Sequence, residues 1–320
     1  MPIAPPAPES PPRRVHVTEV GLRDGLQNEP VVLATDQKLA LARALIAAGV
    51  REFEVTSFVS PRAVPALADA AELVAALRDT PGLHLSALVP NLRGAERALE
   101  AGVDSVVLFV SASESHNAKN VNRSVEASLA GFERVARLLE GSGVALRGAI
   151  ATAFGCPFEG NVPVQAVGGI ARRFADLGAT HLSLGDTTGM ATPPLVAERV
   201  HHLRGAVPDL PLTLHFHNTR GIGLANVMQG LALGVERYES AIGGLGGCPF
   251  APGASGNIAS EDLVYLLEEM GIDTGLELDG LIGAARLAGE LMGRPLPAQV
   301  SKAGPRLALA ECTAVPTARG

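Results

Sequence analysis

Two histidines separated by one residue are the first feature of this sequence that points to chemistry. His215 and His217 close an apolar run that reads as a strand, in the order Leu-His-Phe-His-Asn. Residues i and i+2 of a strand project to the same side, so the two imidazoles point together. Two imidazoles on one side at a strand end make half of a metal site. The alternative is a pair of structural polar residues, and the spacing favours metal binding.

Oxygen-bearing side chains in two other segments complete a candidate ligand set. Asp24 follows Arg23 directly after the first apolar run, and Asn257 ends a glycine-rich stretch where a helix is expected to begin. Two nitrogens and two oxygens without a thiolate favour Mg²⁺ or Mn²⁺, with positions left for substrate oxygens. The alternatives are a surface ion pair for Arg23 and Asp24, and a helix N-cap for Asn257.

The stretch from residue 243 to residue 257 has the composition of an active-site lid. Six of its fifteen residues are glycine and two are proline, which is typical of a mobile loop over a site. Cys248 is the only reactive side chain in its middle, and the alternative for it is a small buried apolar residue. Cys156 lies in a Gly-Cys-Pro-Phe tetrapeptide that recurs at residues 247–250. We interpret Cys156 as structural.

The elements that must position these residues alternate regularly along the chain. Ala- and Leu-rich segments of helical length separate short apolar runs, and glycines at 49, 102, 178 and 234 each close a helical segment just before a strand. This alternation predicts an α/β fold, a (β/α)₈ TIM barrel with its active site at the carboxyl ends of the strands. The predicted strands lie near Val15–Val20, Glu52–Thr56, Leu83–Val89, Ser105–Val110, Val144–Ala151, His181–Leu184, Leu212–His217 and Arg237–Ile242.

A doubly wound open sheet is the alternative architecture. It would need a glycine-rich G-x-G-x-x-G turn after its first strand to bind a dinucleotide, and residues 21–25 lack that spacing. We therefore predict one barrel domain over residues 15–292, which ends in an extra C-terminal helix near 278–292. A disordered Pro-rich N-terminal tail (1–14) and a C-terminal tail (293–320) flank it.

The composition excludes several classes of protein. Of 320 residues, 47% are hydrophobic and only 3% aromatic, and the formal net charge is −7. The apolar share argues against disorder, and the acidic balance with few stacking aromatics argues against nucleic-acid binding. No apolar run is long enough to predict a membrane helix. Three cysteines fit a reducing compartment, so we expect a cytoplasmic protein, and the preference for Arg over Lys indicates a bacterial source.

Four segments together resemble the 3-hydroxy-3-methylglutaryl-CoA lyases, metal-dependent enzymes of the TIM-barrel lyase superfamily. They are the run at 19–29 that contains Arg23 and Asp24, Thr-Ser-Phe-Val-Ser-Pro at 56–61, Ser-Leu-Gly-Asp-Thr at 183–187, and the glycine-rich run continued to residue 265. The resemblance covers about residues 15–292. The lid with its cysteine is specific to the lyases, whereas the Arg-Asp pair and the H-x-H occur also in related lyases and in condensing synthases.

The resemblance implies a cation-dependent cleavage of 3-hydroxy-3-methylglutaryl-CoA to acetyl-CoA and acetoacetate, in leucine or related branched-acid catabolism, by a homodimer. It assigns the cation to Asp24, His215, His217 and Asn257. It implies that Arg23 contacts the thioester carbonyl, that Cys248 is the catalytic cysteine, and that Glu54 and Glu261 support the site. Asp186, at the end of the sixth predicted strand, is a candidate to handle the hydroxyl proton or to hold a histidine.

Substrate contacts are expected from three further residues. Asn120 and Arg123 follow the fourth predicted strand, where they and Lys119 could meet CoA, and a solvated loop is the alternative. Arg220 departs from the family pattern: the lyases usually have Asp-Thr-Tyr-Gly-Gln after the second histidine, and here the chain has Asn-Thr-Arg-Gly-Ile at 218–222. Arg220 is a candidate for the substrate carboxylate or for a surface ion pair. Pro30 replaces a lysine that is common in the family.

Two other readings of the function stay open at this point. A related lyase would cleave another 3-hydroxy-3-alkylglutaryl-CoA or a citramalyl-type thioester. A condensing acyl-CoA synthase of the same superfamily would run the carbon chemistry in the opposite direction. The lid cysteine argues against the synthase, because a synthase needs a base to form the enolate whereas a thiol donates a proton to it.

Replacing Cys248 with Ala should leave substrate binding intact and lower turnover by ~10²-fold or more, since the enolate then loses its general acid. Steady-state kinetics of acetoacetate release would measure both effects. Turnover equal to that of the unmodified protein would remove Cys248 from the mechanism.

Overall fold

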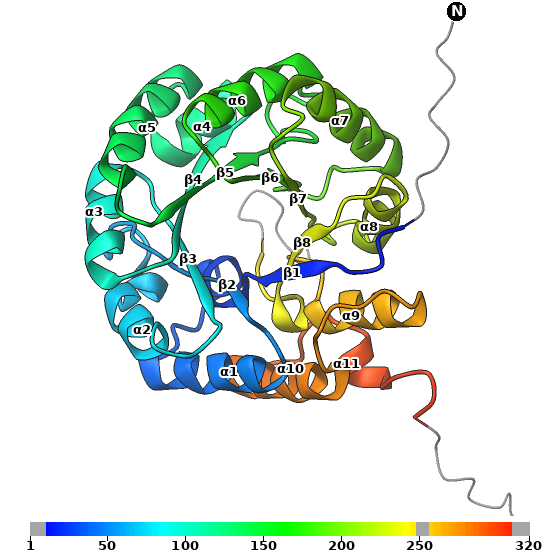
Figure 1. Cartoon of the computed structure of the whole chain (residues 1–320). Helices are drawn as coiled ribbons and strands as arrows, with labels where there is room; N and C mark the ends of the chain where they lie inside the picture. Colours follow the sequence, from blue (N-terminus) through cyan, green and yellow to red (C-terminus); the bar gives the residue numbers. More distant parts are fainter. Residues whose placement is uncertain (1–10, 248–255, 309–320) are drawn as a thin grey trace, which may run out of the picture.

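Eight parallel strands close into a barrel in the computed structural model, which describes residues 11–247 and 256–308 (Figure 1). Each strand pairs with the next along the chain, and β8 pairs with β1. The predicted TIM barrel is therefore confirmed. The strands are β1 (His16–Glu19), β2 (Glu52–Ser57), β3 (His84–Leu88), β4 (Ser105–Ser111), β5 (Ala145–Ala151), β6 (His181–Gly185), β7 (Leu212–His215) and β8 (Arg237–Ser240).

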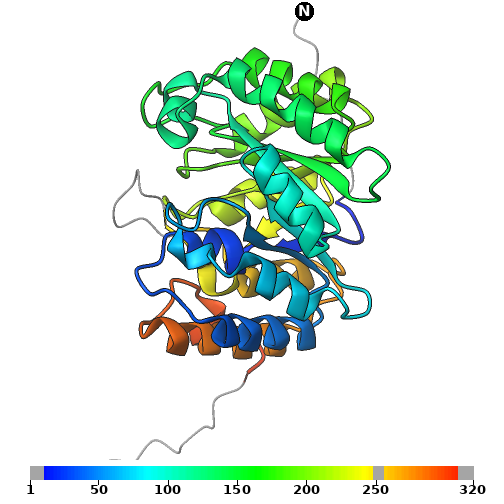
Figure 2. The ribbon, with the colours of Figure 1, turned by 90° about the vertical axis from the view of Figure 1, so that its left-hand side faces the viewer.

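Helices surround the barrel and cover its outer face (Figure 1). The extra C-terminal helix, α10, spans the range expected for it and lies against α1 and α9, as Figures 1 and 2 both show. No helix in the described ranges is long and apolar enough to cross a membrane. The helices are α1 (Thr35–Ala47), α2 (Ala70–Leu77), α3 (Leu92–Ala101), α4 (Glu114–Val121), α5 (Val125–Leu139), α6 (Val164–Asp176), α7 (Pro193–Ala206), α8 (Gly223–Ala232), α9 (Ser260–Glu269), α10 (Leu278–Met292) and α11 (Val300–Ala303).

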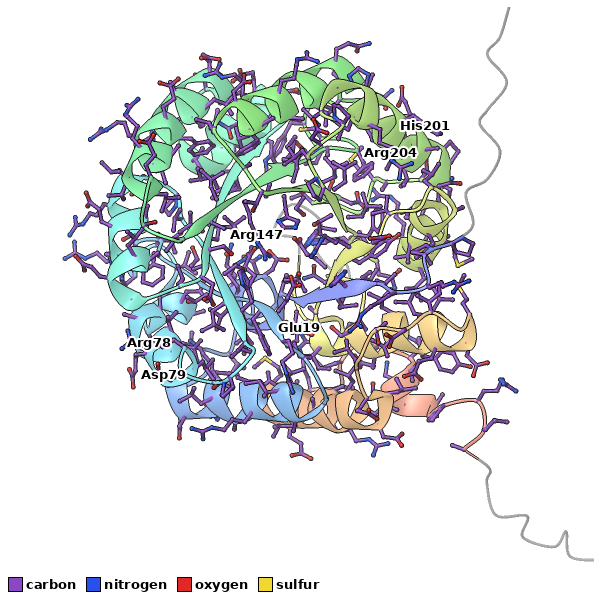
Figure 3. The ribbon with its side chains drawn as sticks, viewed as in Figure 1. Glu19, Arg78, Asp79, Arg147, His201 and Arg204 are labelled. Carbon is purple, nitrogen blue, oxygen red and sulfur yellow. The ribbon has the colours of Figure 1, made fainter. Side chains whose placement is uncertain are left out.

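The two faces of the strands differ in chemistry. Residues that point outward toward the helices are apolar and fully buried, as Leu108, Ile150 and Leu184 illustrate. Many inward residues are charged: the Glu52 carboxylate lies 3.6 Å from Arg147 and 3.5 Å from Arg237 in the barrel interior. Figure 3 shows Arg147 within the ring of strands. The apolar core is therefore the layer between sheet and helices, and the interior is available for polar chemistry.

Both ends of the predicted domain extend further than the sequence indicates. Arg13 and Arg14, assigned to the N-terminal tail, pair with the backbone of Asp273. After α10, the alternation of Leu296, Ala298 and Val300 places three apolar side chains in the core, a short pattern that sequence analysis did not register. The segment from residue 294 to residue 303 therefore packs against the barrel. Cys248 and Cys312 lie outside the described residues, as does most of the Pro-rich tail.

The C-terminal segment reaches the loops at the mouth of the barrel. Arg294 donates two hydrogen bonds to the Glu29 carboxylate, at 2.6 and 2.8 Å, and so holds the loop that follows β1. The amide of Ala298 donates to the carbonyl of Gly243, which begins the segment after β8. The amide of Val300 donates to Asp262 on α9. The segment thus braces two loops that lead to candidate site residues.

In the connection between β8 and α9, the outgoing backbone at Gly246 and the returning backbone at Gly256 lie against each other. We call this close approach the neck. On the returning side, Gly256 accepts a hydrogen bond from Asn218 and Ile258 donates to Phe216. This pairing ends β7 at His215, two residues before the predicted end. A Cβ added to Gly256 would overlap the carbonyl of Gly246 on the outgoing side. Only glycine therefore allows the two sides of the neck to approach this closely.

Replacing Gly256 with Ala should lower the free energy of unfolding by about 1–3 kcal/mol, because the added methyl group forces the neck apart. Urea denaturation would measure this change. The matched control is Gly283→Ala on the exposed face of α10, where no atom lies near the new Cβ and the substitution should stabilise the helix by up to about 1 kcal/mol. A Gly256→Ala protein as stable as the control would contradict the steric argument.

Candidate metal centre and active site

Three predicted ligands converge at the mouth of the barrel. Asp24 lies in the single helical turn at Gly21–Gly25 that follows β1, His215 ends β7, and His217 lies two residues further on. One ligand atom of each residue lies within 4.8 Å of those of the other two. The structure thus brings together residues that are almost 200 positions apart in the chain, because β1 and β7 both end at the same rim.

The two imidazoles present the same nitrogen to the same oxygen. Nε2 of His215 lies 4.0 Å and Nε2 of His217 lies 3.7 Å from Oδ2 of Asp24. Nδ1 of His215 makes a hydrogen bond of 2.9 Å with the Glu239 carboxylate. A carboxylate on Nδ1 fixes the tautomer that leaves Nε2 available to a metal ion. The ring of His215 is therefore oriented for binding an ion between the histidines and Asp24.

Asn257 joins this cluster through the neck described above. Its backbone bridges to His217, and its side-chain amide donates hydrogen bonds to Asp24 at 2.9 Å and to the carbonyl of Leu245 at 3.0 Å. Its Oδ1 is buried and has no hydrogen-bond partner among the described residues. The helix α9 begins at Ser260 with Ala259 as its N-cap, so the N-cap alternative for Asn257 is wrong. A buried amide oxygen without a donor is suited to a cation.

Arg23 lies between two carboxylates and is held by both. It donates a hydrogen bond of 2.6 Å to Asp24 through Nη1 and another to Glu54 through Nε. Only 12% of its side chain is exposed. The surface ion pair considered for Arg23 and Asp24 is therefore wrong: the pair is largely buried, and Glu54 fixes the plane of the guanidinium from β2.

The pKa values of these groups follow from burial and from their charged neighbours. Burial disfavours the charged form of Asp24, but Arg23 and the two imidazoles outweigh it and hold the pKa of Asp24 well below its usual value. Burial likewise opposes protonation of His215, but Glu239 outweighs it and raises the pKa of that histidine. For Glu54, burial together with the nearby Glu239 and Asp24 prevails over Arg23, and its pKa is raised. The cluster thus carries more negative charge than Arg23 balances.

This donor set fits a divalent cation. The carboxylates of Asp24 and Glu54 share the single guanidinium of Arg23, and Glu239 pairs with His215. When the histidines are neutral, these three carboxylates leave two negative charges unbalanced. A divalent ion beside Asp24 would remove that excess, and mixed imidazole, carboxylate and amide ligands suit Mg²⁺ or Mn²⁺.

The candidate ligands open onto a pocket of about 530 Å³. One side is polar and includes the candidate ligands, and the other is formed by apolar side chains of β3, β4 and β5. Two of the predicted substrate contacts, Asn120 and Arg123, belong to the lining, whereas the described lining does not include Lys119 or Arg220. The polar residues of the lining are Arg23, Asp24, Gln27, Asn28, Ser60, Asn91, His116, Asn120, Arg123, Ser128, Ser183, Thr187, His215, His217 and Glu239.

The remaining predicted site residues lie around this pocket. Glu261 is fully buried at the start of α9 and accepts a hydrogen bond from Gly243, and burial raises its pKa to about 7. Asp186 accepts hydrogen bonds from the amides of Met190 and Ala191, so it shapes the loop after β6, and burial raises its pKa. Arg220 donates to the carbonyls of Thr188 and Gly189 in the same loop.

Cys156 belongs to a buried turn and not to the pocket lining. Its sulfur accepts hydrogen bonds from the Ser113 hydroxyl at 2.9 Å and the Phe158 amide at 3.3 Å, and its backbone pairs with Gly160. These contacts support the structural interpretation.

Sequence analysis missed two glutamates that organise the site. Glu239 forms the hydrogen bond with His215. The sequence signal that could have revealed it is an acidic residue inside a strand, in the order Arg-Tyr-Glu-Ser. Glu19 ends β1 and accepts hydrogen bonds from the amides of Gly21 and Ile242 and from the hydroxyl of Ser260. Figure 3 marks Glu19 beside β1. Burial raises its pKa to about 7. Glu19 thus ties the turn that carries Arg23 and Asp24 to the segments after β8.

Comparison with known proteins agrees with this geometry. The family model described as HMGL-like matches residues 14–288. The chain is 43% identical to a hydroxymethylglutaryl-CoA lyase of Bacillus subtilis, over 90% of this chain and 96% of the relative. It is 44% identical to an (R)-citramalyl-CoA lyase of Chloroflexus aurantiacus, over 91% and 95%. A solved HMG-CoA lyase of Acinetobacter baumannii, in complex with coenzyme A and 3-methylmalate, superposes with a TM-score of 0.89 at 43% identity, covering 93% of this chain and 97% of that one.

Replacing Glu239 with Gln should weaken Mn²⁺ binding by about 10–100-fold, because the amide no longer fixes the charge and tautomer on His215. Replacing Asp24 with Ala should weaken it further, since this change removes a ligand oxygen. Titration of free Mn²⁺ by electron paramagnetic resonance would measure both. The control is Glu126→Gln on the exposed surface of α5, which should bind Mn²⁺ as the unmodified protein does. Unchanged affinity in the Asp24→Ala protein would refute the ligand assignment.

Proposed function

The chain belongs to the HMGL-like family of carbon–carbon lyases, and we propose that it cleaves 3-hydroxy-3-methylglutaryl-CoA to acetyl-CoA and acetoacetate. The observation that carries this proposal is the convergence of His215, His217 and Asp24 beside the buried Arg23 at one side of a pocket. Proteins of this family depend in general on a divalent metal, and relatives that match nine-tenths of the chain are named as such lyases.

The reaction breaks the bond between the tertiary carbinol carbon and the α-carbon of the thioester. When bound, a divalent cation supplies Lewis acidity that makes the tertiary hydroxyl easier to deprotonate. We propose that Asp24, His215, His217 and the free Oδ1 of Asn257 hold it. Their burial and mutual hydrogen bonds restrict these side chains before substrate arrives, which limits the reorganisation needed during the reaction.

Arg23 is placed to stabilise the charge that develops as the bond breaks. The electron pair of the bond moves onto the acetyl-CoA fragment and forms an enolate, with negative charge on the thioester oxygen. A guanidinium fixed by Glu54 and Asp24 offers donors to that oxygen without having to be ordered first. We propose that Glu54 positions Arg23, and that Glu261 and Glu19 keep the surrounding loops in place.

Two proton transfers complete the chemistry. The hydroxyl proton leaves as the ketone of acetoacetate forms, and we propose Asp186 as the acceptor. Its raised pKa makes it a stronger base than an exposed carboxylate, and its Oδ2 has no hydrogen-bond partner among the described residues. The enolate carbon of acetyl-CoA takes up one proton, for which we propose the thiol of Cys248.

Coenzyme A is proposed to enter past Asn120 and Arg123, which line the pocket on the side of β4 and α4. Arg123 suits a phosphate or pantetheine oxygen by charge and geometry. The structure of a relative named as bound to coenzyme A supports an acyl-CoA substrate for this site. The homodimer, the cytoplasmic location and the role in leucine degradation stay predictions.

Sequence similarity to one relative favours citramalyl-CoA as a second candidate substrate. The relative named as (R)-citramalyl-CoA lyase is as similar in sequence as those named for the six-carbon substrate. Cleavage of citramalyl-CoA breaks the same kind of bond and yields acetyl-CoA and pyruvate, so it would use the same residues. The two substrates differ only in the group attached to the carbinol carbon.

Purified protein with Mg²⁺ and 3-hydroxy-3-methylglutaryl-CoA should release acetoacetate, and EDTA should abolish the release because it removes the ion that Asp24, His215 and His217 hold. Pyruvate release from (R)-citramalyl-CoA in a parallel assay would assign the second substrate. Condensation of acetyl-CoA with a 2-oxo acid, with no cleavage of either thioester, would show that the chain is a synthase and overturn the proposal.

A further inference from the structure

The residues of β5 and β6 that face the pocket from inside the barrel are small, whereas Ile150 between them packs toward the helices. Ala149 and Ala151 on β5, and Ser183 and Gly185 on β6, line the pocket. A Cβ on Gly148 would meet Phe174 and Leu182, so Gly148 faces the helices and its neighbour Ala149 faces the interior. Ala149 and Ala151 are only half-buried although they point into a closed barrel. Barrel interiors are normally filled by bulky branched side chains, so this wall leaves a space, here named the β5–β6 hollow.

The hollow begins beside the candidate metal ligands and runs below them. Gly185 pairs in register with His215, so the upper level of the hollow lies next to the histidine. Ala149 pairs with Ser183 one inward-facing layer lower. Two residues along a strand span about 7 Å. Because the strands are tilted against the barrel axis, the two layers differ in depth by about 5 Å along that axis. The hollow therefore reaches well below the point where the substrate oxygens would bind.

The hollow is closed at its lower end. Arg147 and His181 form the next inward layer on the same two strands and line a separate small cavity together with Glu54 and Glu239. A group as long as the pantetheine arm of CoA therefore cannot pass through the hollow. That arm must leave across the rim, where Asn28 and Arg123 line the mouth. The hollow is left for the other end of the substrate.

The chemistry of the hollow selects an uncharged group. Its four small residues carry no charge, and its one hydroxyl, on Ser183, makes a hydrogen bond with Glu239. A carboxylate placed here would lie on the same wall as the Glu239 carboxylate, which repels it, and it would lose its hydration. The oxygen-bearing arms of the substrate belong with the metal ligands on the facing side. An alkyl group on the carbinol carbon is then the part that points into the hollow.

We propose that the β5–β6 hollow binds the alkyl substituent of the carbinol carbon, and that the substrates of this chain extend from the 3-methyl compound to 3-hydroxy-3-alkylglutaryl thioesters of CoA with a longer alkyl group. At about 1.5 Å per carbon–carbon bond, a methyl group fills only the upper level, and a chain of three or four carbons reaches Ala149. Ala149 is then the residue that sets the length of the alkyl group. This proposal rests on the proposed lyase function and specifies its substrate.

The test compares binding of two non-cleavable thioether analogues, one with a methyl and one with a propyl group on the carbinol carbon, in the presence of Mg²⁺. Isothermal titration should show that the unmodified protein binds the propyl analogue at least as tightly as the methyl analogue. Replacing Ala149 with Phe should weaken the propyl analogue by about 10–200-fold relative to the methyl analogue, the range for methylene-sized misfits in apolar pockets. Ala149→Ser, which leaves the hollow open, is the control and should keep the original preference.

Two results would overturn the proposal: weaker binding of the propyl analogue by the unmodified protein, or equal losses of both analogues in the Ala149→Phe protein. Thermal unfolding of each variant shows that any loss comes from the pocket and not from misfolding. Because the analogues are not cleaved, the outcome is separate from that of the lyase assay. Cleavage of the methyl substrate with rejection of the propyl analogue refutes only the hollow, and tight propyl binding without cleavage of any substrate refutes only the lyase function.

Discussion

The carboxylate of Asp24 is the group on which the whole site depends. Its Oδ2 accepts a hydrogen bond from Asn257 and faces Nε2 of both histidines, while its Oδ1 accepts one from Arg23. Four side chains from three segments of the chain therefore meet at one pair of oxygen atoms. Glu19 fixes the helical turn after β1, because its carboxylate accepts hydrogen bonds from the amides of Gly21 and of Ile242 in the segment after β8. Any displacement of that turn would move both the guanidinium and the ligand oxygen.

Bringing these groups together is opposed by electrostatic repulsion between carboxylates. Asp24, Glu54 and Glu239 are buried or nearly so, and charged groups of one sign in such a place oppose one another. Arg23 and the imidazoles hold the pKa of Asp24 low, whereas burial and the neighbouring carboxylates outweigh Arg23 at Glu54 and raise its pKa. A divalent cation bound here would relieve this repulsion and would thereby stabilise the folded chain. The apolar layer between the sheet and the helices supplies the stability that tolerates such a site.

The sequence predicted the barrel and the convergence of Asp24 with the two histidines because each depends on a local signal. Apolar runs and glycine stops mark the strands, and strand ends share one rim, so Asp24 and the H-x-H had to approach each other. Glu239 could not be found in this way: its role comes from the pairing of β7 with β8, which places it opposite His215. The packing of residues 294–303 escaped prediction for a related reason, since Leu296 and Ala298 are buried by loops that are distant in sequence.

Two residues that depart from the family pattern, Asn218 and Arg220, hold loops near the rim of the barrel through hydrogen bonds. Arg220 holds the loop after β6 through the carbonyls of Thr188 and Gly189, and the side chain of Asn218 accepts a hydrogen bond from the amide of Gly223. Neither lines the pocket within the described residues. In the proposed mechanism, the residues at the ends of β1 and β7 determine the type of bond cleaved, and the rim substitutions leave these residues unchanged. We propose that the facing wall, where Ala149 and Ala151 line the pocket with small side chains, selects the acyl group.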